Sequence, residues 1–301
     1  MITVLGSINM DLIATVQRLP APGETVAGKD FATAAGGKGA NQALAAGRAG
    51  SAVRMVGAVG NDQFAAPSLE LLVEAGIDIE AIRKVDGATG TALILVESSG
   101  ENAIAVIPGA NGHIDETSAM DTAGLMSPGD HLLLQLEIPA AAIRTALQAA
   151  RERGATSVLN IAPLTDEAVE LAANADIVIA NETEFERLAG VSSMAPEERE
   201  NALMDLHGQS GQTIIVTLGA EGVIAARDSA LLRAESLPIE PVDTVGAGDT
   251  FCGYLAAGLD RGELFDAALR QAAVAGRLAC LKPGAQPAIP HRADVEAAIS
   301  R

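Results

Sequence analysis

Residues 243–250 carry residue types suited to transferring a charged group. Gly246, Ala247 and Gly248 leave the backbone N–H groups almost uncovered, so a ligand can approach them closely. A helical pattern begins here, and the free N–H groups and positive dipole of a helix start attract anions. Asp249 would repel a phosphate at this turn, which indicates a general base that deprotonates an alcohol during phosphoryl transfer. A simple helix N-cap is the alternative, since Asp is common at that position.

A second glycine-rich turn lies at residues 36–42 and opens another helical pattern. It lacks the glycine spacing and the Ser or Thr of a Walker A P-loop, and it lacks the G-x-G-x-x-G dinucleotide fingerprint. The turn does place a cation, Lys38, and an amide, Asn41, next to exposed backbone at Gly37. These groups suit hydrogen bonds to a polyhydroxylated ligand, whereas a plain turn with a solvated lysine is the alternative.

Polar residues also follow several expected strands. Asn9 and Asp11 follow the first strand, where the ligands of doubly wound folds lie, and a carboxylate there can accept two sugar hydroxyls. Glu137 follows the strand pattern at residues 131–136 and is either another hydroxyl acceptor or a favourable acid in the first turn of a helix. These three side chains predict a sugar-binding edge of the sheet.

Two further turns are suited to a nucleotide. Asn181 and Glu184 follow the strand pattern at residues 177–180, and the carboxylate could hold a water-rich Mg²⁺. The alternative is that Asn181 only caps the next helix. A glycine turn after the strand at residues 213–218 either contacts a phosphate or ribose or simply reverses the chain. Its candidate residues are Thr217, Gly219 and Gly222.

Composition excludes several classes of function. The net charge of −19 argues against a nucleic-acid partner, and an anionic nucleotide would need Mg²⁺ and a locally positive site. No apolar run approaches the roughly 20 residues that span a bilayer, and the start of the chain lacks a secretory-signal pattern, so we expect no membrane partner. Two cysteines form no disulfide framework and suit the cytoplasm, and the four scattered histidines predict no transition-metal site.

The alternation of strand and helix patterns predicts an α/β fold, a doubly wound and mostly parallel sheet flanked by helices. An antiparallel hairpin is expected at residues 222–227 and 231–237. The other expected strands are residues 53–59, 131–136, 157–161, 177–180 and 213–218. The expected helices are residues 38–49, 62–75, 139–153, 182–188, 196–209, 248–258 and 262–281.

Two segments break this alternation, residues 12–33 and residues 89–107. The second contains a hairpin signal at Ser98-Ser99-Gly100-Glu101-Asn102. Together they predict a small β-sheet that acts as a lid, a dimerisation surface or both, with ordinary edge hairpins as the alternative. We therefore expect a core of residues 1–10, 37–88 and 109–301, and a lid of residues 11–36 and 89–108. Because exposed sheet edges are usually paired or covered, a homodimer through the lid is expected.

Six motifs together resemble the ribokinase family of sugar and nucleoside kinases in type and order. They are residues 6–11, 22–25, 36–42, 181–184, 217–219 and 243–250, and the resemblance covers nearly the whole chain. It implies a ribokinase-like fold and transfer of the ATP γ-phosphoryl group to the 5-hydroxyl of a pentose, giving ribose 5-phosphate from ribose. The alternatives are another sugar or a nucleoside as substrate, or a non-catalytic sugar-binding protein on this fold.

The resemblance also implies roles for individual residues. Asp249 is the base, and the backbone of Gly246, Ala247 and Gly248 forms the anion hole. Sugar contacts are implied for Asn9, Asp11, Gly37, Lys38, Asn41, Glu137 and Asp249. Nucleotide contacts are implied for Asn181, Glu184, Thr217, Gly219, Gly222 and Gly248, with Glu184 holding Mg²⁺ through water.

The family further implies activation by K⁺ beside the anion hole. The implied ligands are the Asp243 carboxylate and the carbonyls of Val245, Cys280, Pro283 and Ala285. Ala288 stands where family members often supply a Ser hydroxyl, and Ala273 where a His often lies near the adenine. The lid positions that would shape substrate choice are aliphatic, which favours a bare pentose over a nucleoside because no aromatic ring is present to stack on a base. They are Ala92, Ile94, Ile104 and Val106.

Overall fold

The computed structural model describes residues 1–97 and 101–300. Within these residues the main sheet has nine strands in the order β13-β12-β11-β10-β9-β8-β1-β4-β5. The strands from β11 to β5 are parallel, and β12 and β13 continue the sheet as an antiparallel hairpin. The strands are β1 (Ile2–Leu5), β4 (Val53–Val59), β5 (Ile82–Lys84), β8 (His131–Leu134), β9 (Thr156–Asn160), β10 (Ile177–Asn181), β11 (Thr213–Thr217), β12 (Val223–Arg227) and β13 (Ala230–Ala234).

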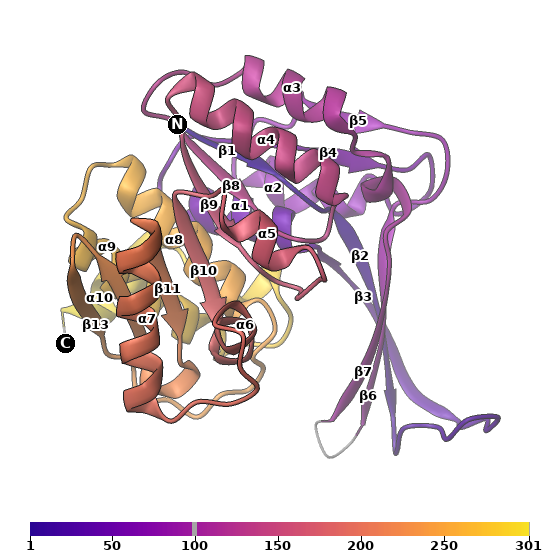
Figure 1. Ribbon diagram of the computed structural model, residues 1–301. Helices are drawn as coiled ribbons and strands as arrows, with labels where there is room; N and C mark the ends of the chain where they lie inside the picture. Colours follow the sequence, from indigo (N-terminus) through magenta and orange to yellow (C-terminus); the bar gives the residue numbers. More distant parts are fainter. Residues whose placement is uncertain (98–100, 301) are drawn as a thin grey trace.

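Helices cover both faces of this sheet (Figure 1). Alternate residues of one strand enter different cores: Leu133 of β8 packs in the core with α1, α8 and α9, while Leu132 and Leu134 pack in the core with α3, α4 and α6. This burial on two faces confirms the doubly wound architecture expected from the continuous apolar strands. The α-helices are α1 (Lys38–Arg48), α2 (Glu70–Glu74), α3 (Glu116–Gly124), α4 (Ala140–Arg153), α5 (Ala168–Ala172), α6 (Glu182–Leu188), α7 (Pro196–Ser210), α8 (Ala247–Asp260), α9 (Phe265–Ala279) and α10 (Arg292–Ile299).

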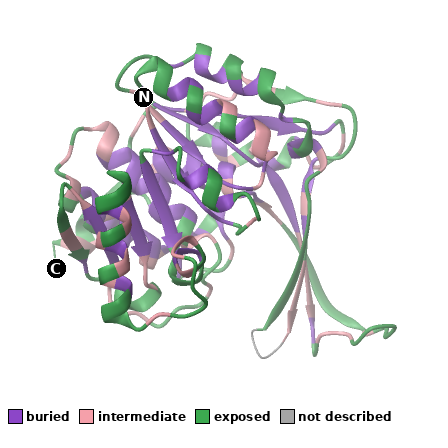
Figure 2. Cartoon of the chain, in the orientation of Figure 1, coloured by how far each residue is buried: buried purple, intermediate pink, exposed green. Residues whose placement is uncertain are grey.

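A separate sheet of order β3-β2-β6-β7 projects from the main body as a twisted ribbon (Figure 1). It consists of β2 (Asn9–Val16), β3 (Gly28–Gly36), β6 (Gly90–Glu97) and β7 (Asn102–Ile107). β6 and β7 form the expected antiparallel pair, although Ser98, Ser99 and Gly100 of the expected turn lie outside the described residues. Figure 2 shows that the strands of the main sheet are mostly buried, whereas β3 and β7 are largely exposed. We call this second sheet the lid sheet.

Three sequence expectations need correction. Asn9 and Asp11 follow the first strand, but they belong to a strand that was not expected there, because the chain bends after β1 and re-enters extended structure as β2. The helix expected at residues 62–75 is reduced to the 3₁₀ turn η1 (Pro67–Leu69) and the short α2. The Asp62 carboxylate accepts N–H bonds from Phe64, Ala65 and Thr89, which holds the start of this segment in a loop instead of a helix. The second hairpin strand ends at Ala234.

Further 3₁₀ turns connect these elements: η2 (Gly109–His113), η3 (Gly219–Glu221) and η4 (Gln286–Ala288). Among the helices of the described chain, none is both long and apolar enough to cross a bilayer.

Candidate active site

The start of α8 forms an open backbone turn. Gly246 is its N-cap residue and has φ 75°, a left-handed conformation that favours glycine. An added Cβ at Gly246 would lie 2.9 Å from the Cβ of Ala285, so the turn packs tightly on the segment behind it. At Gly248 an added Cβ would meet no described atom within 4 Å, so this residue faces open space. Tight packing behind and open space in front leave the helix start free to receive an anion.

Asp249 lies in the first turn of α8, but Gly246 is the N-cap residue and no side-chain cap hydrogen bond is formed there. Asn41 Nδ2 donates to Asp249 Oδ2 at 2.9 Å, and Gln42 Nε2 donates to Asp249 Oδ1 at 3.0 Å. The residue is only 6% exposed, yet it lines a cavity with Lys38, Glu184 and Gly248. Because both carboxylate oxygens bond to amides of α1, the alternative of a simple helix cap is wrong.

Several ionisable groups interact electrostatically with Asp249 or with one another. The Asp249 carboxylate raises the pKa of Lys38, while burial opposes the shift and Glu137 and Glu184 add to it. Burial, Glu137 and Asp249 raise the pKa of Asp11 from 3.8 to about 6, and Lys38 partly offsets this. Burial also raises the pKa of Glu184. The carboxylates therefore repel one another and favour cations or hydroxyl donors in the space between them.

The turn between the lid sheet and α1 is built around Glu137. Glu137 Oε2 accepts hydrogen bonds from Ser7 Oγ at 2.6 Å and from the Lys38 N–H at 3.1 Å. Gly37 has φ 89°, and an added Cβ would lie 2.7 Å from the Asn9 nitrogen, so only glycine fits between β2 and α1. The carboxylate thus ties the end of β8 to the start of α1.

A cavity beside this turn is lined both by residues of the lid sheet and by residues that follow β8 of the main sheet. Asn9, Asn111 and Glu137 line it together with Val106 of β7. Asn111 Nδ2 donates to Asn9 Oδ1 at 2.7 Å, so the Asn9 amide is held by a buried neighbour. Strand register places Ala92 opposite Val106 and Asp11, and Ile94 opposite Ile104, so these lid residues share one face.

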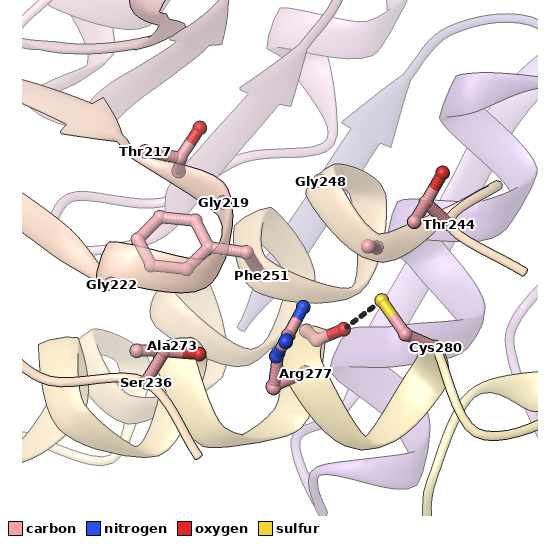
Figure 3. Close-up of a pocket in the computed structure, with 12 residues that line it drawn as sticks. Thr217, Gly219, Gly222, Ser236, Thr244, Gly248, Phe251, Ala273, Arg277 and Cys280 are labelled. Atoms are coloured by element: carbon pink, nitrogen blue, oxygen red, sulfur yellow. Dashed lines mark hydrogen bonds between the residues drawn. The ribbon is translucent and has the colours of Figure 1, made fainter. Parts of the chain in front are cut away.

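A neighbouring pocket lies between η3 and α9 (Figure 3). Its wall contains many small residues, and the ring of Phe251 lies beside the turn of Gly219 and Gly222. Arg277 lines it too, and its guanidinium donates to the backbone oxygens of Leu237 and Ile239. This pocket and the Asp249 cavity share three lining residues, Thr217, Thr244 and Gly248. The two spaces therefore meet at the start of α8.

Asn181 and Glu184 form a reciprocal capping box at the start of α6. The Glu184 N–H donates to Asn181 Oδ1, and the Asn181 N–H donates to Glu184 Oε2, both at 2.8 Å. The capping alternative therefore holds for Asn181. Both residues also line the Asp249 cavity, so capping and ligand contact are compatible.

The two stretches suggested to bind a monovalent cation, residues 243–245 and 280–285, contact each other in the structure. Asp243 Oδ2 accepts the Gly284 N–H at 2.8 Å, and Asp243 Oδ1 accepts the Val245 N–H at 3.0 Å. The Cys280 carbonyl accepts the N–H groups of Val242 and Asp243, at 2.8 and 3.3 Å. These bonds use both lone pairs of that carbonyl, which weighs against Cys280 as a cation ligand.

The sequence interpretation missed three residues that touch the assigned groups. Ser7 bonds to Glu137, Asn111 bonds to Asn9, and Gln42 bonds to Asp249. Ser7 and Gln42 lie inside the motifs that the sequence singled out, but neighbouring helix residues point in directions about 100° apart. Sequence alone therefore did not reveal that Asn41 and Gln42 both reach one carboxylate.

Comparisons with known proteins identify the family of this chain. Residues 1–292 match the family described as pfkB family carbohydrate kinase. The chain is 37% identical to the ribokinase of Haemophilus influenzae over 292 residues, covering 97% of this chain and 95% of that protein. It is 35% identical to the ribokinase of Bacillus subtilis over 299 residues, covering 99% of each.

The fold is similar to a solved structure of Arabidopsis thaliana ribokinase complexed with ribose and ATP. The TM-score is 0.89 at 30% identity, covering 100% of this chain and 98% of that one. Because the match covers the whole of this chain, it extends over the residues of both the main sheet and the lid sheet. The motif resemblance is therefore confirmed, and the chain belongs to the pfkB family of carbohydrate kinases.

Proposed function

We propose that this protein transfers the γ-phosphoryl group of ATP to O5 of D-ribose, giving D-ribose 5-phosphate and ADP. The observation that carries the proposal is the Asp249 carboxylate, held by two amides at the wall of a cavity that opens on the bare backbone of Gly248. The ribokinases at 37% and 35% identity support ribose as the acceptor. The ribose and ATP in the Arabidopsis structure support this substrate pair.

In this mechanism Asp249 accepts the proton of the sugar hydroxyl as that oxygen attacks the γ-phosphorus. The N–H groups of Gly246 and Gly248, with the positive end of α8, would stabilise the charge on the transferring group. The Ala247 N–H donates to the Thr244 carbonyl at 3.3 Å, so it would join the anion hole only by giving up that long hydrogen bond. The cavity wall aligns the two substrates, which is most of what phosphoryl transfer requires of a protein. Proton acceptance and anion stabilisation come from adjacent positions of one helix turn, so their relative geometry is rigid.

The sugar would occupy the junction of the lid sheet and α1. Carboxylates there accept hydroxyl hydrogens, and the amides and Lys38 donate to ring and hydroxyl oxygens. The pKa of Asp11 is raised because burial and nearby carboxylates make its negative charge unfavourable. Hydroxyl donors of a bound sugar would stabilise that charge. The proposed sugar contacts are Asn9, Asp11, Gly37, Lys38, Asn41, Glu137 and Asp249.

The nucleotide would occupy the pocket of Figure 3, with its phosphates directed toward Gly248. Thr217, Gly219 and Gly222 would contact the nucleotide, and Asn181 would lie near its phosphates. Open space at Gly248 fits a phosphate, since a side chain there would fill it. Glu184 fits an Mg²⁺ site in which water supplies most ligands, because Mg²⁺ often binds proteins through one carboxylate. Bound Mg²⁺ would neutralise phosphate charge.

Activation by K⁺ is part of the proposal. The ligands would be the Asp243 carboxylate and the carbonyls of Val245, Pro283 and Ala285, since oxygen is the ligand type that hard cations prefer. Ala285 packs directly on Gly246, so a cation held there would support the helix start. Ala288 contributes no side-chain oxygen, which leaves the backbone and Asp243 to supply the ligands.

We also propose that the lid, residues 11–36 and 89–108, is a unit distinct from the core and forms a homodimer contact. Exposed apolar side chains on the lid sheet, among them Phe31 and Leu93, support this arrangement. A cytoplasmic location is proposed because the two cysteines, Cys252 and Cys280, are free thiols.

The test of the proposed function is the variant Asp249→Asn. It keeps the size of the side chain and removes its basicity, so kcat for ATP-dependent ribose phosphorylation should fall about 10²- to 10⁴-fold. Activity would be followed by coupling ADP release to NADH oxidation, with ribose, deoxyribose, fructose and adenosine as acceptors. Circular dichroism would establish that the variant is folded. Near-normal turnover of Asp249→Asn would exclude the mechanism, and preferred turnover of adenosine would exclude ribose as the main acceptor.

A further inference from the structure

Three buried amide side chains lead from the main sheet to Asp249. Gln135, just after β8, donates from Nε2 to Gln42 Oε1 at 2.7 Å. Gln42 Nε2 donates to Asp249 Oδ1 at 3.0 Å and to Asn160 Oδ1 at 3.2 Å. Gln42 and Gln135 are 0% exposed, so these groups exchange hydrogen bonds with protein and not with solvent. The function proposed above names the Gln42 amide only as one of the two that bond to Asp249, and it assigns no role to Gln135 or Asn160.

The direction of these hydrogen bonds is determined by a backbone carbonyl. Asn160 Nδ2 donates to the carbonyl of Ile179 at 3.2 Å, and a carbonyl can only accept. The Asn160 oxygen must therefore face Gln42, and the nitrogen of the Gln42 amide must face Asn160. The same nitrogen faces Asp249. The Ile179 carbonyl, acting through the Asn160 amide, therefore determines that Gln42 presents a hydrogen-bond donor to Asp249.

The reverse orientation of the Gln42 amide is strongly unfavourable. Its oxygen would then face Asp249 Oδ1 and Asn160 Oδ1, and its nitrogen would face the nitrogen of Gln135. All three hydrogen bonds would become contacts between like groups, in a place where no solvent can compensate. The side chain of Gln135 fits at this place because Gly6 has no side chain. A Cβ added at Gly6 would lie 2.1 Å from Gln135 Oε1.

We propose that Gln42 is a positioning residue for the base, and that Asn160 and Gln135 hold its amide in the donating orientation. This inference rests on the proposed kinase function. A neutral donor stabilises the ionised carboxylate of Asp249 without adding a charge that would compete with Lys38. It also holds one carboxylate oxygen in place, so the remaining lone pairs keep a constant direction toward the cavity. The charged and titratable groups that interact with Asp249 from the surrounding elements are Asp11, Lys38, Glu184 and Cys252.

The test compares Gln42→Met and Gln42→Glu with the unaltered protein, using ATP and ribose. Methionine has a similar length and shape but neither donates nor accepts strongly. We expect kcat to fall about tenfold to a hundredfold, which is the usual effect of losing a hydrogen bond to a charged group. KM for ribose should change less than about threefold, since the sugar contacts remain. The acidic limb of the kcat/KM pH profile should move to higher pH, because a carboxylate without its donor is protonated more easily.

Gln42→Glu should move that limb further than Gln42→Met, because it places a second acid against Asp249. Gln135→Met should give a smaller change in the same direction, and it provides the test if the Gln42 variants do not fold. The double variant of Gln42→Met and Asp249→Asn should be no slower than Asp249→Asn alone, because Gln42 acts only through the base. Gln212→Met is the matched control, since Gln212 is a partly buried glutamine that donates to Ala172 and Ala175 backbone oxygens outside the cavities assigned to the substrates.

An unshifted pH profile and normal kcat in the Gln42 and Gln135 variants would overturn the inference, as would an equal loss in Gln212→Met. A loss confined to KM would also overturn it, because that result would place Gln42 in sugar binding. These outcomes differ from failure of the proposed function, in which Asp249→Asn itself would remain active.

Discussion

The main sheet and the lid sheet use similar apolar strands but differ in what covers them. In β8, Leu132, Leu133 and Leu134 are 0% exposed because helices pack on both faces. In β7, every residue from Asn102 to Ile107 is exposed (Figure 2). Apolar patterning therefore determines that a strand forms, whereas the covering helices determine whether it becomes part of a rigid wall.

This difference matches the division of the proposed chemistry. Asp249 and the amides that hold it lie on elements packed against the main sheet, so the base has a constant position. Asn9, a proposed sugar contact, and Val106 line the cavity beside Glu137, and both come from the lid sheet. The proposed base thus lies in the region that helices cover, and part of the proposed sugar contact lies on the lid sheet, which helices do not cover.

The largest effect that tests this comparison is a matched pair of phenylalanine truncations. Phe185 of α6 is 0% exposed, and Phe31 of β3 is 64% exposed. Phe185→Ala should lower the free energy of unfolding by about 3–5 kcal/mol, because it removes buried surface and leaves a cavity. Phe31→Ala, measured at high dilution, should change it by less than about 0.5 kcal/mol. Urea denaturation followed by circular dichroism measures both, and equal losses would contradict the distinction between the two regions.

The second prediction concerns Asp11, which lies where the two regions meet. Burial and neighbouring carboxylates raise its pKa from 3.8 to about 6 in the folded protein. The folded state therefore holds this proton more tightly than the unfolded state, so stability falls as the pH rises from about 4 to about 6, and the full loss is reached above about pH 6. Asp11→Asn should be more stable than the parent by about 1–3 kcal/mol at pH 7 and equal to it below about pH 4.

The same variant should bind the sugar less well, because an amide accepts fewer hydroxyl hydrogens than a carboxylate. Denaturation curves at pH 4, 5, 6 and 7, with KM for ribose at pH 7, measure both effects. A stability difference that is constant across this range would show that Asp11 titrates elsewhere. An unchanged KM would remove Asp11 from the proposed sugar contacts.

The smallest expected effect on the folded monomer concerns the uncovered face of the lid. Leu93 of β6 is 47% exposed, so Leu93→Asp should change the stability of the isolated monomer by less than about 0.5 kcal/mol. It should nevertheless abolish the proposed homodimer, because a carboxylate would be buried without a partner at the contact. Light scattering across a concentration series measures this. Val169→Asp on α5, where Val169 is 43% exposed, is the matched control and should leave the assembly state unchanged.

Much of the fold was predictable because its determinants are local. The expected strand at residues 53–59 agrees with β4 at both ends, and the helix expected at residues 182–188 agrees with α6. The expectation failed where a side chain competes with helical hydrogen bonds, as Asp62 does by binding three backbone N–H groups. The start of β2 was missed for another reason, since strand pairing between Asn9 and Gly36 joins distant parts of the chain.

By itself, the sequence determined the strand–helix alternation, the glycine turns and the acid that follows one of them, since these depend on residue type and short spacing. It also identified Asp249 as a candidate base but left open whether it caps α8. Only the tertiary structure decided that question, by placing Asn41 and Gln42 of α1 against a carboxylate about two hundred residues later. A side chain satisfies the nearest donor in space, and that donor is known only when the helices have packed on the sheet.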